Sequence, residues 1–463
     1  MVTTLLEWTV MASVAYLLGT YAIVLATLAV HIVAGKRERK SQTEDLASLA
    51  VSRFTIPVSV LVPAFNEERL IVASVQSLLD LNYPEFEVIV VSDGSADGTM
   101  EQLRDAFDIK PREMFYRRLL PTQPVRRIFR SVRDPRLTVI EKVHGGKADA
   151  LNCGVNLARY RYLCCVAADT VYDRDALLGS MPAAIQDPAT VLGVTSHVDV
   201  SIHPESGGSG PDVDRHVLSN FQHLERLRWL MNNRLVWTWL NFRLGSARAF
   251  GIWRRDAILD VDGFATDLTG EEIDITFRVQ EKYARQDQPG RVVALATFLG
   301  KTEAPDRMSH LIRQRARWQR VVWESAWRYR HMFANRQFGR VGLIGFPYFA
   351  VSQIVSPLVQ LVAVVAWPLA WWTGVITGMD FLRLVGMVAL CNGIVTSMAI
   401  LLHETNFRTH RLASLARLIL LGPLEPFLYR PAILCARLQG AWSFLTGDRT
   451  WDRPDRNRPL QAL

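Results

Sequence analysis

The stretch VSVLVPAFNEE, residues 58–68, decides the fold class of this chain, because it joins a β-branched apolar run to a segment that predicts a helix. The run Val58–Val62 suits one buried strand and stops at Pro63. A second run, Val88–Val91, leads into VSDGSADGT at 91–99. Apolar strands separated by helices indicate a parallel sheet that is covered on both faces.

The same alternation continues along the chain. A helix is predicted over Glu67–Leu79, and two further strands over Leu137–Ile140 and Tyr162–Ala167. The basic, weakly patterned segment Asp108–Arg136 is interpreted as an insertion loop. We therefore expect an α/β fold with a doubly wound, mostly parallel sheet. In such sheets ligands bind beyond the carboxyl ends of the strands, so acidic residues placed there should meet in one crevice.

Long uncharged segments flank this region on both sides. Trp8–Gly35 is long enough to span a bilayer, which needs about 20 apolar residues, and the basic run KRERK follows at 36–40. The positive-inside rule then places the next domain in the cytoplasm. Val341–Met379 is interpreted as an interfacial helix leading into one span or as a hairpin, and Leu384–Leu402 as another span. The charged stretch Leu412–Leu445 is expected at the interface or around a protein-enclosed cavity, which gives roughly three to five spans.

The composition narrows the class of partner. With 53 Lys+Arg against 45 Asp+Glu, the chain has a formal net charge of +8. The basic residues gather beside the apolar segments, which favours a lipid bilayer over nucleic acid as the charged partner. The 5 cysteines are odd in number and lack metal-ligand spacing, so reduced thiols in a cytoplasmic domain are the simplest interpretation.

Three polar side chains follow predicted strands or open a helix. Asp93 lies in VSDGS and Asp169 in AADTVYD, each directly after a strand. In HGGKADALNCG, Lys147 lies on a glycine turn at a helix start, where a cation and free N–H groups suit phosphate oxygens. Taken singly, each is equally explained as an ordinary turn or loop residue.

Two further motifs lie on predicted helices. TGEEID, residues 269–274, places acids in a first helical turn, where they also favour the positive N-terminus without any catalytic role. QRARW, residues 314–318, lies on an amphipathic helix, and its arginines and tryptophan are also typical of an interfacial anchor. Gln314 and Arg317 are three residues apart, so both face the same side of that helix.

In this order the motifs resemble the D, D, D, Q-x-x-R-W signature of membrane-integrated, processive glycosyltransferases of family 2, which include cellulose, chitin, hyaluronan and poly-N-acetylglucosamine synthases. The resemblance implies a GT-A type nucleotide-binding fold inserted between transmembrane helices. The regions it implies are an N-terminal transmembrane helix (1–35), a charged linker (36–56), a cytoplasmic glycosyltransferase domain (57–306), amphipathic interfacial helices with QRARW (307–340), a C-terminal transmembrane or interfacial region (341–446) and a polar tail (447–463).

The resemblance also assigns roles to single residues. It implies that the donor nucleotide is bound by Glu67, Asp93, Lys147, Asp169, Gln314 and Arg317. It implies that the acceptor is bound by Gly245, Ser246 and Trp318, and that catalysis rests on Glu272 or Asp274. Glu272 takes the position of the general base, with Glu271 or Asp274 as substitutes. Asp169 is expected to bind Mg²⁺ or Mn²⁺, because a divalent cation offsets the charge on the departing diphosphate.

Two positions depart from the family pattern. Ala167 stands where the family has the first acid of Asp-x-Asp, so only Asp169 remains of that pair. Glu272 is one methylene longer than the usual aspartate base. The lost carboxylate puts full metal or nucleotide affinity in question.

The activity implied is that of an inverting transferase of the plasma (inner) membrane, multi-pass, with its catalytic domain in the cytoplasm. It would elongate and extrude a β-linked polysaccharide from UDP-N-acetylglucosamine or UDP-glucose, with the growing polysaccharide as acceptor. An accessory subunit is a partner that the sequence leaves open. Two alternatives are a non-processive transferase acting on a lipid acceptor and an inactive homologue serving as a scaffold in a synthase complex. Q-x-x-R-W argues against the first, and the joint presence of Asp93, Lys147 and Asp169 against the second.

Overall fold

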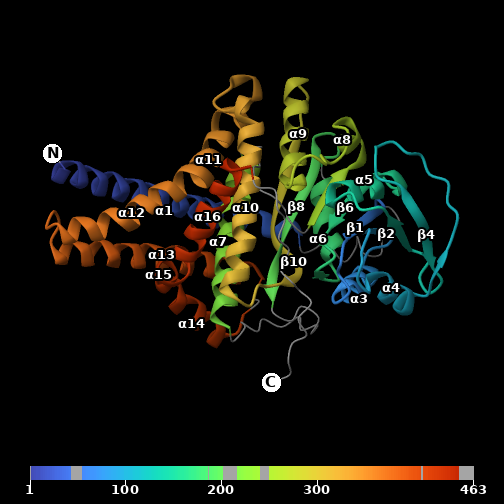
Figure 1. The fold of residues 1–463 in the computed structure, drawn as a ribbon, viewed down its shortest axis with the longest axis horizontal. Helices are drawn as coiled ribbons and strands as arrows, with labels where there is room; N and C mark the ends of the chain where they lie inside the picture. The colour runs from blue at the N-terminus through green and yellow to red at the C-terminus, as the bar shows by residue number, and fades with distance from the viewer. Residues whose placement is uncertain are drawn as a thin grey trace.

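The computed structural model describes residues 2–42, 55–185, 187–201, 216–239, 250–407 and 410–447. Its elements form an α/β domain on one side and a group of long helices on the other (Figure 1). Helices α7 (Val217–Trp239), α10 (Met308–Arg328) and α16 (Arg430–Leu445) lie between the two parts. Helix α7 contacts long helices on one side and the sheet on the other, so it joins the two parts.

The described strands form one mixed sheet with the order β3-β4-β5-β2-β1-β6-β9-β8-β10-β7. They are β1 (Val58–Ala64), β2 (Phe86–Asp93), β3 (Ile109–Pro111), β4 (Val125–Ser131), β5 (Leu137–Lys142), β6 (Tyr162–Val166), β7 (Thr170–Tyr172), β8 (Val191–Ser201), β9 (Phe250–Arg254) and β10 (Arg291–Glu303). Strands β5, β2, β1 and β6 are parallel neighbours, which confirms the four strands predicted from apolar runs. Strand β9 is antiparallel to both β6 and β8, and β10 is parallel to β8.

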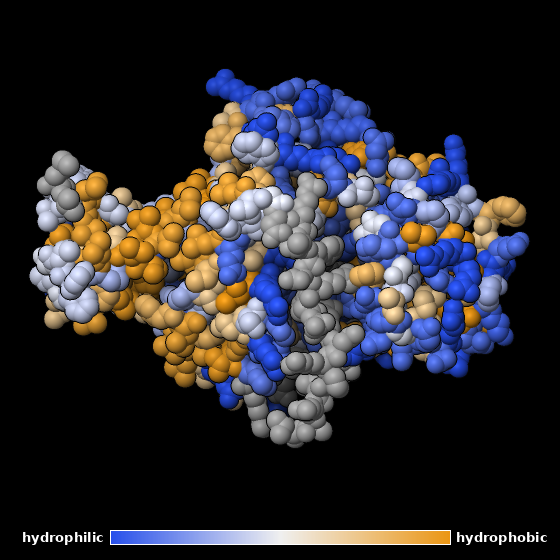
Figure 2. All heavy atoms as spheres, viewed as in Figure 1, coloured by the Kyte–Doolittle hydropathy of each residue, from blue (hydrophilic) through white to orange (hydrophobic). Residues whose placement is uncertain are grey.

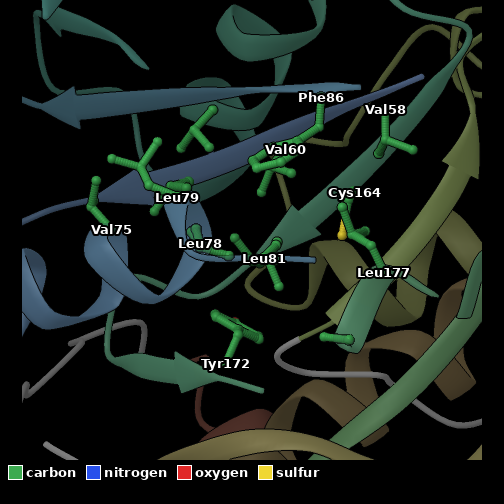
Figure 3. Close-up of a cluster of buried hydrophobic side chains, with 14 of the residues drawn as sticks. Val58, Val60, Val75, Leu78, Leu79, Leu81, Phe86, Cys164, Tyr172 and Leu177 are labelled. Atoms are coloured by element: carbon green, nitrogen blue, oxygen red, sulfur yellow. The ribbon is translucent and has the colours of Figure 1, made fainter. Parts of the chain in front are cut away.

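The remaining helices of the α/β domain are α3 (Ile71–Leu79), α4 (Thr99–Phe107), α5 (Lys147–Leu157), α6 (Ala176–Ile185), α8 (Arg255–Asp260) and α9 (Glu271–Arg285). Alternate residues of β1 pack into different cores, because successive side chains of a strand point to opposite faces. Val58, Val60 and Val62 belong to one core and Leu61 to the other. Figure 3 shows side chains of the first core gathered between the sheet and α3. The sheet is thus covered on both faces, as predicted.

Two local predictions were wrong. The segment interpreted as an insertion loop contains β3 and β4, which extend the sheet edge in antiparallel register from β5. Burial alternates only over the last four residues of β4, and the adjacent exposed residues Arg126 and Arg127 break the two-residue period. The helix predicted from Glu67 begins only at Ile71. Asn66 has a positive φ of 53°, and the Glu67 N–H donates to Thr99 Oγ1 at 2.9 Å, so this part forms a loop.

Outside the α/β domain, three helical stretches among the described residues are long and apolar enough to cross a membrane: Thr3–Ala29, Val341–Trp372 and Gly378–Thr405. They lie in α1 (Val2–Gln42), in the run ending with α11 (Phe346–Ala350) and α12 (Ser356–Trp372), and in α13 (Gly378–Phe407). The second stretch is one continuous helical run, so the hairpin alternative was wrong. Apolar surface gathers over α1, α12 and α13, whereas the α/β domain is mainly polar (Figure 2).

The last stretch forms α14 (Leu412–Leu421), α15 (Glu425–Leu428) and α16, and bends by 48° between its two halves. If this bent pair counts as one span, up to 4 helices qualify. The acidic residue of this stretch is buried against protein. Glu425 is 0% exposed, accepts from Arg228 of α7 at 2.6 Å and pairs with Arg430 at 2.9 Å. Paired charges of this kind are tolerated inside a helical bundle.

Candidate active site

The loops after β1 and β2 bind each other through short polar side chains. The Asn66 N–H donates to Ser95 Oγ at 3.1 Å, and the Ala96 N–H donates to Asn66 Oδ1 at 2.9 Å. Glu68 Oε2 accepts from the Gly98 N–H at 2.9 Å. The two motifs PAFNEE and VSDGSADGT therefore form one edge, as their pairing in the sequence suggested. The half-buried side chain of Glu67 lies in this edge.

At the end of β2, Asp93 is the centre of a buried network. Its carboxylate is 2% exposed and accepts from the N–H groups of Gly145 at 3.0 Å and Gly146 at 2.7 Å. It also accepts from Lys142 Nζ at 2.5 Å, and His144 Nδ1 lies 2.9 Å from it. These bonds fix the glycine turn that leads into α5. Because both carboxylate oxygens of Asp93 are bonded to protein groups, Asp93 supports the shape of this turn.

Lys142 is the buried cation of this network, and the sequence analysis missed it. Its side chain is 0% exposed and pairs with Asp93 at 2.5 Å and with Asp149 of α5 at 2.6 Å. The register of the sheet explains the contact, since Asp93 and Lys142 are partners at the ends of the parallel strands β2 and β5. A lysine that ends an apolar strand, one residue before VHGGK, was the only signal in the sequence.

The turn held by Asp93 brings Lys147 against the TGEEID motif. Lys147 begins α5, and its Nζ lies 2.7 Å from Glu271 Oε1 and 2.5 Å from Glu272 Oε1 at the start of α9. Burial alone would lower the pKa of Lys147, but the two carboxylates raise it, so this side chain stays protonated. The glutamate side chains differ in access: Glu272 is 24% exposed and Glu271 only 9%. Glu272 is therefore the better placed of the two to meet a substrate.

Asp274, two residues after Glu272, is not accessible in the way that Glu272 is. Its side chain is 0% exposed and accepts from the Tyr329 hydroxyl at 2.6 Å. It also pairs with Arg278 at 2.7 Å. A catalytic role of Asp274 stays a prediction, and in this structure its closed, paired carboxylate connects α9 to the end of α10.

Asp169 lies between β6 and β7 with its side chain half-buried. Thr302 of β10 donates to the Asp169 carbonyl at 3.2 Å, and Thr170 Oγ1 lies 3.3 Å from its carboxylate. Ala167 stands where the family has the first acid of its Asp-x-Asp pair. Its backbone N–H donates to the Tyr172 hydroxyl at 2.8 Å. These bonds hold the turn between β6 and β7, in which Asp169 is the remaining carboxylate of the Asp-x-Asp pair.

The QRARW segment lies in the first half of α10. Arg315 of this segment forms an ion pair with Glu225 of α7 at 2.6 Å. The Arg315 guanidinium also covers the Trp318 ring, 4.2 Å from its centroid. Gln314 Oε1 is buried and has no hydrogen-bond partner within the described ranges. An unpaired buried oxygen is costly, so Gln314 is suited to receive a ligand donor.

Close glycine contacts fix α10 on two sides. A Cβ on Gly270, directly before α9, would overlap the Val321 side chain of α10, and Thr269 Oγ1 donates to Glu324 of α10 at 2.6 Å. A Cβ on Gly440 of α16 would overlap the carbonyl oxygen of Ala316 inside QRARW. The start of α9 and the QRARW helix are therefore parts of one packed unit.

Replacing Gly440 by valine is expected to destabilise this unit by about 1–3 kcal/mol, because overpacked side chains force backbone shifts. The melting temperature of the detergent-purified protein measures the effect. Gly386→Val is the matched control, since nothing lies within 4 Å of a Cβ built on that helical glycine. Equal melting temperatures for the two variants would show that α16 does not press on QRARW.

Two predicted acceptor residues, Gly245 and Ser246, lie outside the described residues. The structure nevertheless brings together Lys147, Glu271 and Glu272. Helix α10, which carries QRARW, packs against Gly270 directly before the two glutamates. Glu67 and Asp169 end neighbouring loops on the carboxyl side of β1 and β6, where ligands of α/β sheets bind. This arrangement defines an α/β transferase domain that is attached to apolar helices.

The sequence matches two families with this architecture. Residues 59–251 match Glycosyl transferase family 2, and residues 162–401 match Glycosyl transferase family group 2. Because the second match covers more than half of the chain, this protein belongs to that glycosyltransferase family. The resemblance stated from its motifs is thereby confirmed.

Particular relatives are poly-beta-1,6-N-acetyl-D-glucosamine synthases. Over 262 residues the chain is 26% identical to the one from Staphylococcus epidermidis. It is 24% identical to the one from Staphylococcus aureus strain COL over the same length. Each alignment covers 56% of this chain and 53% of the relative, so the chain spans about half the length of these relatives.

One solved structure is similar over nearly its whole length. The mannosyltransferase PcManGT from Pyrobaculum calidifontis, in complex with GDP-Man and Mn²⁺, superposes with a TM-score of 0.52. The match covers 92% of this chain and 99% of that one at 17% identity. At this identity the likeness concerns the fold, and it confirms the predicted GT-A type architecture.

Proposed function

We propose that this protein is an inverting, UDP-sugar-dependent hexosyltransferase that elongates a β-linked polysaccharide. The observation that carries the proposal is the meeting of Lys147 with Glu271 and Glu272, backed by the QRARW helix. A protonated amine beside an accessible carboxylate supplies a group for the diphosphate and a base for the acceptor. The similarity to poly-beta-1,6-N-acetyl-D-glucosamine synthases favours UDP-N-acetylglucosamine over UDP-glucose as donor.

The proposed reaction is a single displacement. Glu272 accepts the proton of the acceptor hydroxyl as its oxygen forms a bond to the anomeric carbon of the donor. The bond from that carbon to the UDP oxygen breaks on the opposite side, which inverts the anomeric configuration. Lys147 faces both glutamates in the absence of donor. A bound diphosphate would compete for its ammonium group and so release Glu272 towards the acceptor.

A divalent cation, Mg²⁺ or Mn²⁺, would be held by Asp169. The half-exposed carboxylate fits this task, because such ions are commonly bound by one or two carboxylates together with substrate phosphates and water. When bound, the cation offsets the charge of the diphosphate. Gln314, with its unpartnered Oε1, and Arg317 lie on the helix proposed to contact the same diphosphate region. Ala167 leaves Asp169 as the single carboxylate of this pair.

A cavity supports a path for the product through the apolar helices. It has a volume of about 620 Å³ and is lined by residues of α1, α7, α11, α12, α13, α15 and α16, among others. Its walls include aromatic and basic side chains, among them Trp229, Tyr348, Trp367, Arg430 and Arg437. Glu225, the ion-pair partner of Arg315, also lines it, so the cavity begins next to QRARW. We propose that the polysaccharide leaves the site through this cavity.

The same helices support a location in the plasma (inner) membrane. The basic run KRERK after the first apolar stretch favours the cytoplasm for the transferase domain by the positive-inside rule. Donor sugar nucleotide would then be bound on the cytoplasmic side and the product released across the membrane. An accessory subunit is a further partner that this proposal allows.

Release of UDP by the detergent-purified protein, measured across a panel of UDP-sugars with Mg²⁺ or Mn²⁺, tests the proposal. Release with one donor is expected and would identify the sugar, while the length of the product separates polymer synthesis from a single transfer. A folded protein that binds UDP but releases none from any donor would overturn the proposal in favour of a scaffold. Single-sugar products on lipid would support the non-processive alternative.

Replacing Trp318 by alanine is expected to raise the acceptor KM about tenfold, equivalent to ~1.4 kcal/mol, and to leave donor binding nearly unchanged. One face of the ring is covered by Arg315, so a sugar would stack on the remaining surface. Steady-state kinetics with an oligosaccharide acceptor give both constants. Trp327→Ala, on the same helix and 62% exposed, is the control. Equal losses for donor and acceptor would give Trp318 a structural role instead.

A further inference from the structure

A cluster of histidines lies away from the residues discussed so far, where α13 ends beside α7 and the sheet. His223 belongs to α7, His403 and Glu404 to the end of α13, and His410 comes three residues after the end of α13. Asp199 of β8 adjoins His223. The cluster shares none of its residues with the proposed transferase site, and nothing in that reaction requires three imidazoles here.

The spacing of these groups suits a single metal ion. His403, Glu404 and His410 each offer one ligand atom, and these atoms all lie within 4.8 Å of one another. The ring centroids of His410 and His223 are 5.3 Å apart, and those of His410 and His403 are 5.9 Å apart. Two imidazoles on one tetrahedral zinc ion have centroids roughly 5 Å apart, because each Zn–N bond is about 2.1 Å long. His403, Glu404 and His410 are therefore close enough to share one ion, and the His223 ring lies beside that of His410.

An unpartnered nitrogen gives a second, independent sign of a ligand. His223 Nδ1 lies 2.8 Å from Asp199 Oδ1, and since a carboxylate only accepts, Nδ1 carries the proton. In the neutral imidazole the opposite nitrogen, Nε2, is then a bare acceptor. It is buried and has no hydrogen-bond partner in the described part of the chain, in a residue that is 9% exposed. A carboxylate that orients one imidazole nitrogen while the other binds metal is a recurrent arrangement around zinc.

Charged groups and an aromatic ring adjoin the imidazoles. Asp199 and Glu404 supply two carboxylates, and Arg226 and Lys301 are the basic groups near His223. The Phe298 ring packs against His223 and His403, with centroids 6.2 Å and 6.0 Å away. Imidazole ligands favour zinc over Mg²⁺, which prefers oxygen ligands throughout.

We propose that His223, His403, His410 and Glu404 bind one structural zinc ion, with Asp199 orienting His223. The ion would join the end of the apolar helix α13 to α7, which itself contacts β8 and β10. It would thus fix the transferase domain to the membrane helices, independently of the Mg²⁺ or Mn²⁺ proposed at Asp169.

Elemental analysis of the full chain tests the proposal. The protein is purified in detergent through a tag without histidines, with Mg²⁺ in excess, and its zinc content is measured by mass spectrometry. We expect about one zinc per chain, and loss of most of it in His403→Gln/His410→Gln. His216→Gln, an exposed histidine directly before α7, is the control and should keep its zinc. Absence of zinc in wild type, even after zinc is supplied, would overturn the proposal.

Two measurements keep the test independent of misfolding in the double variant. Co²⁺ taken up by the metal-free wild-type chain should give the visible absorption bands of a tetrahedral site, and octahedral bands would contradict the ligand set. Asp199→Asn keeps all four ligands and should weaken zinc binding about 10–100-fold, as loss of an orienting carboxylate does. Unchanged affinity in this variant would contradict the role given to His223 Nε2.

Discussion

Replacing Glu272 by glutamine is expected to lower sugar transfer by about 10²–10⁴-fold while UDP binding stays nearly unchanged. Glutamine has the same size and can still accept from Lys147, but it cannot take the proton of an acceptor hydroxyl. Among the acids of this motif, Glu272 is the most exposed at 24%, against 9% for Glu271 and 0% for Asp274. Turnover of the UDP-sugar and calorimetric UDP affinity, measured on the same preparation, separate chemistry from binding.

Glu281→Gln is the matched control for this prediction. Glu281 lies on the same helix and pairs with Arg285 and His331 at its far end, so its loss should leave transfer within about twofold. Full activity of Glu272→Gln would remove Glu272 as the base. In that case Glu271→Gln would be the next variant, because Glu271 also contacts Lys147.

Replacing Lys142 by methionine is expected to destabilise the α/β domain by about 3–5 kcal/mol, since it leaves buried carboxylates without their cation. Lys142 is 0% exposed, and its partners Asp93 and Asp149 have side chains only 3% and 8% exposed. Methionine fills a similar volume, so the loss measures charge rather than packing. Urea unfolding followed by circular dichroism reports the free energy of unfolding.

Lys110→Met, at an edge strand and 66% exposed, is the control and should change stability by less than about 0.5 kcal/mol. UDP binding by Lys142→Met should also weaken, because Asp93 would no longer hold the turn before Lys147 in place. If both variants unfold at the same urea concentration, Asp93 and Asp149 are stabilised without Lys142 and the network has been misassigned.

The central strands could be predicted because short apolar runs of β-branched residues favour buried strands. A run such as Val58–Val62 between polar segments can only be buried as a strand, and its neighbours behave alike. Strands β3 and β4 were missed because the adjacent exposed residues Arg126 and Arg127 break the two-residue period of β4. Helix α3 began later than predicted because Glu67 bonds to Thr99 across the loop, a contact that no local pattern encodes.

The candidate site was only partly visible in the sequence. The motifs located Lys147 and the Glu271–Glu272 pair, but their contact joins residues more than a hundred positions apart. Asp274 carries the same charge as its neighbours, and only burial against Tyr329 and Arg278 distinguishes it. Buried polar positions depend on which elements pack together, so composition cannot separate a structural carboxylate from an accessible one.

The sequence by itself determined the class of this protein: apolar runs fixed the strands and the membrane-length helices, and ordered motifs fixed the family. Both are local properties, since hydrophobic length and short spacing are read within one segment. Only the tertiary structure decided the rest, namely that Lys142 neutralises Asp93, that Glu272 is the open acid, and that His403 and His410 gather beside His223. Those facts depend on contacts between distant segments, and packing alone determines which charges and imidazoles meet.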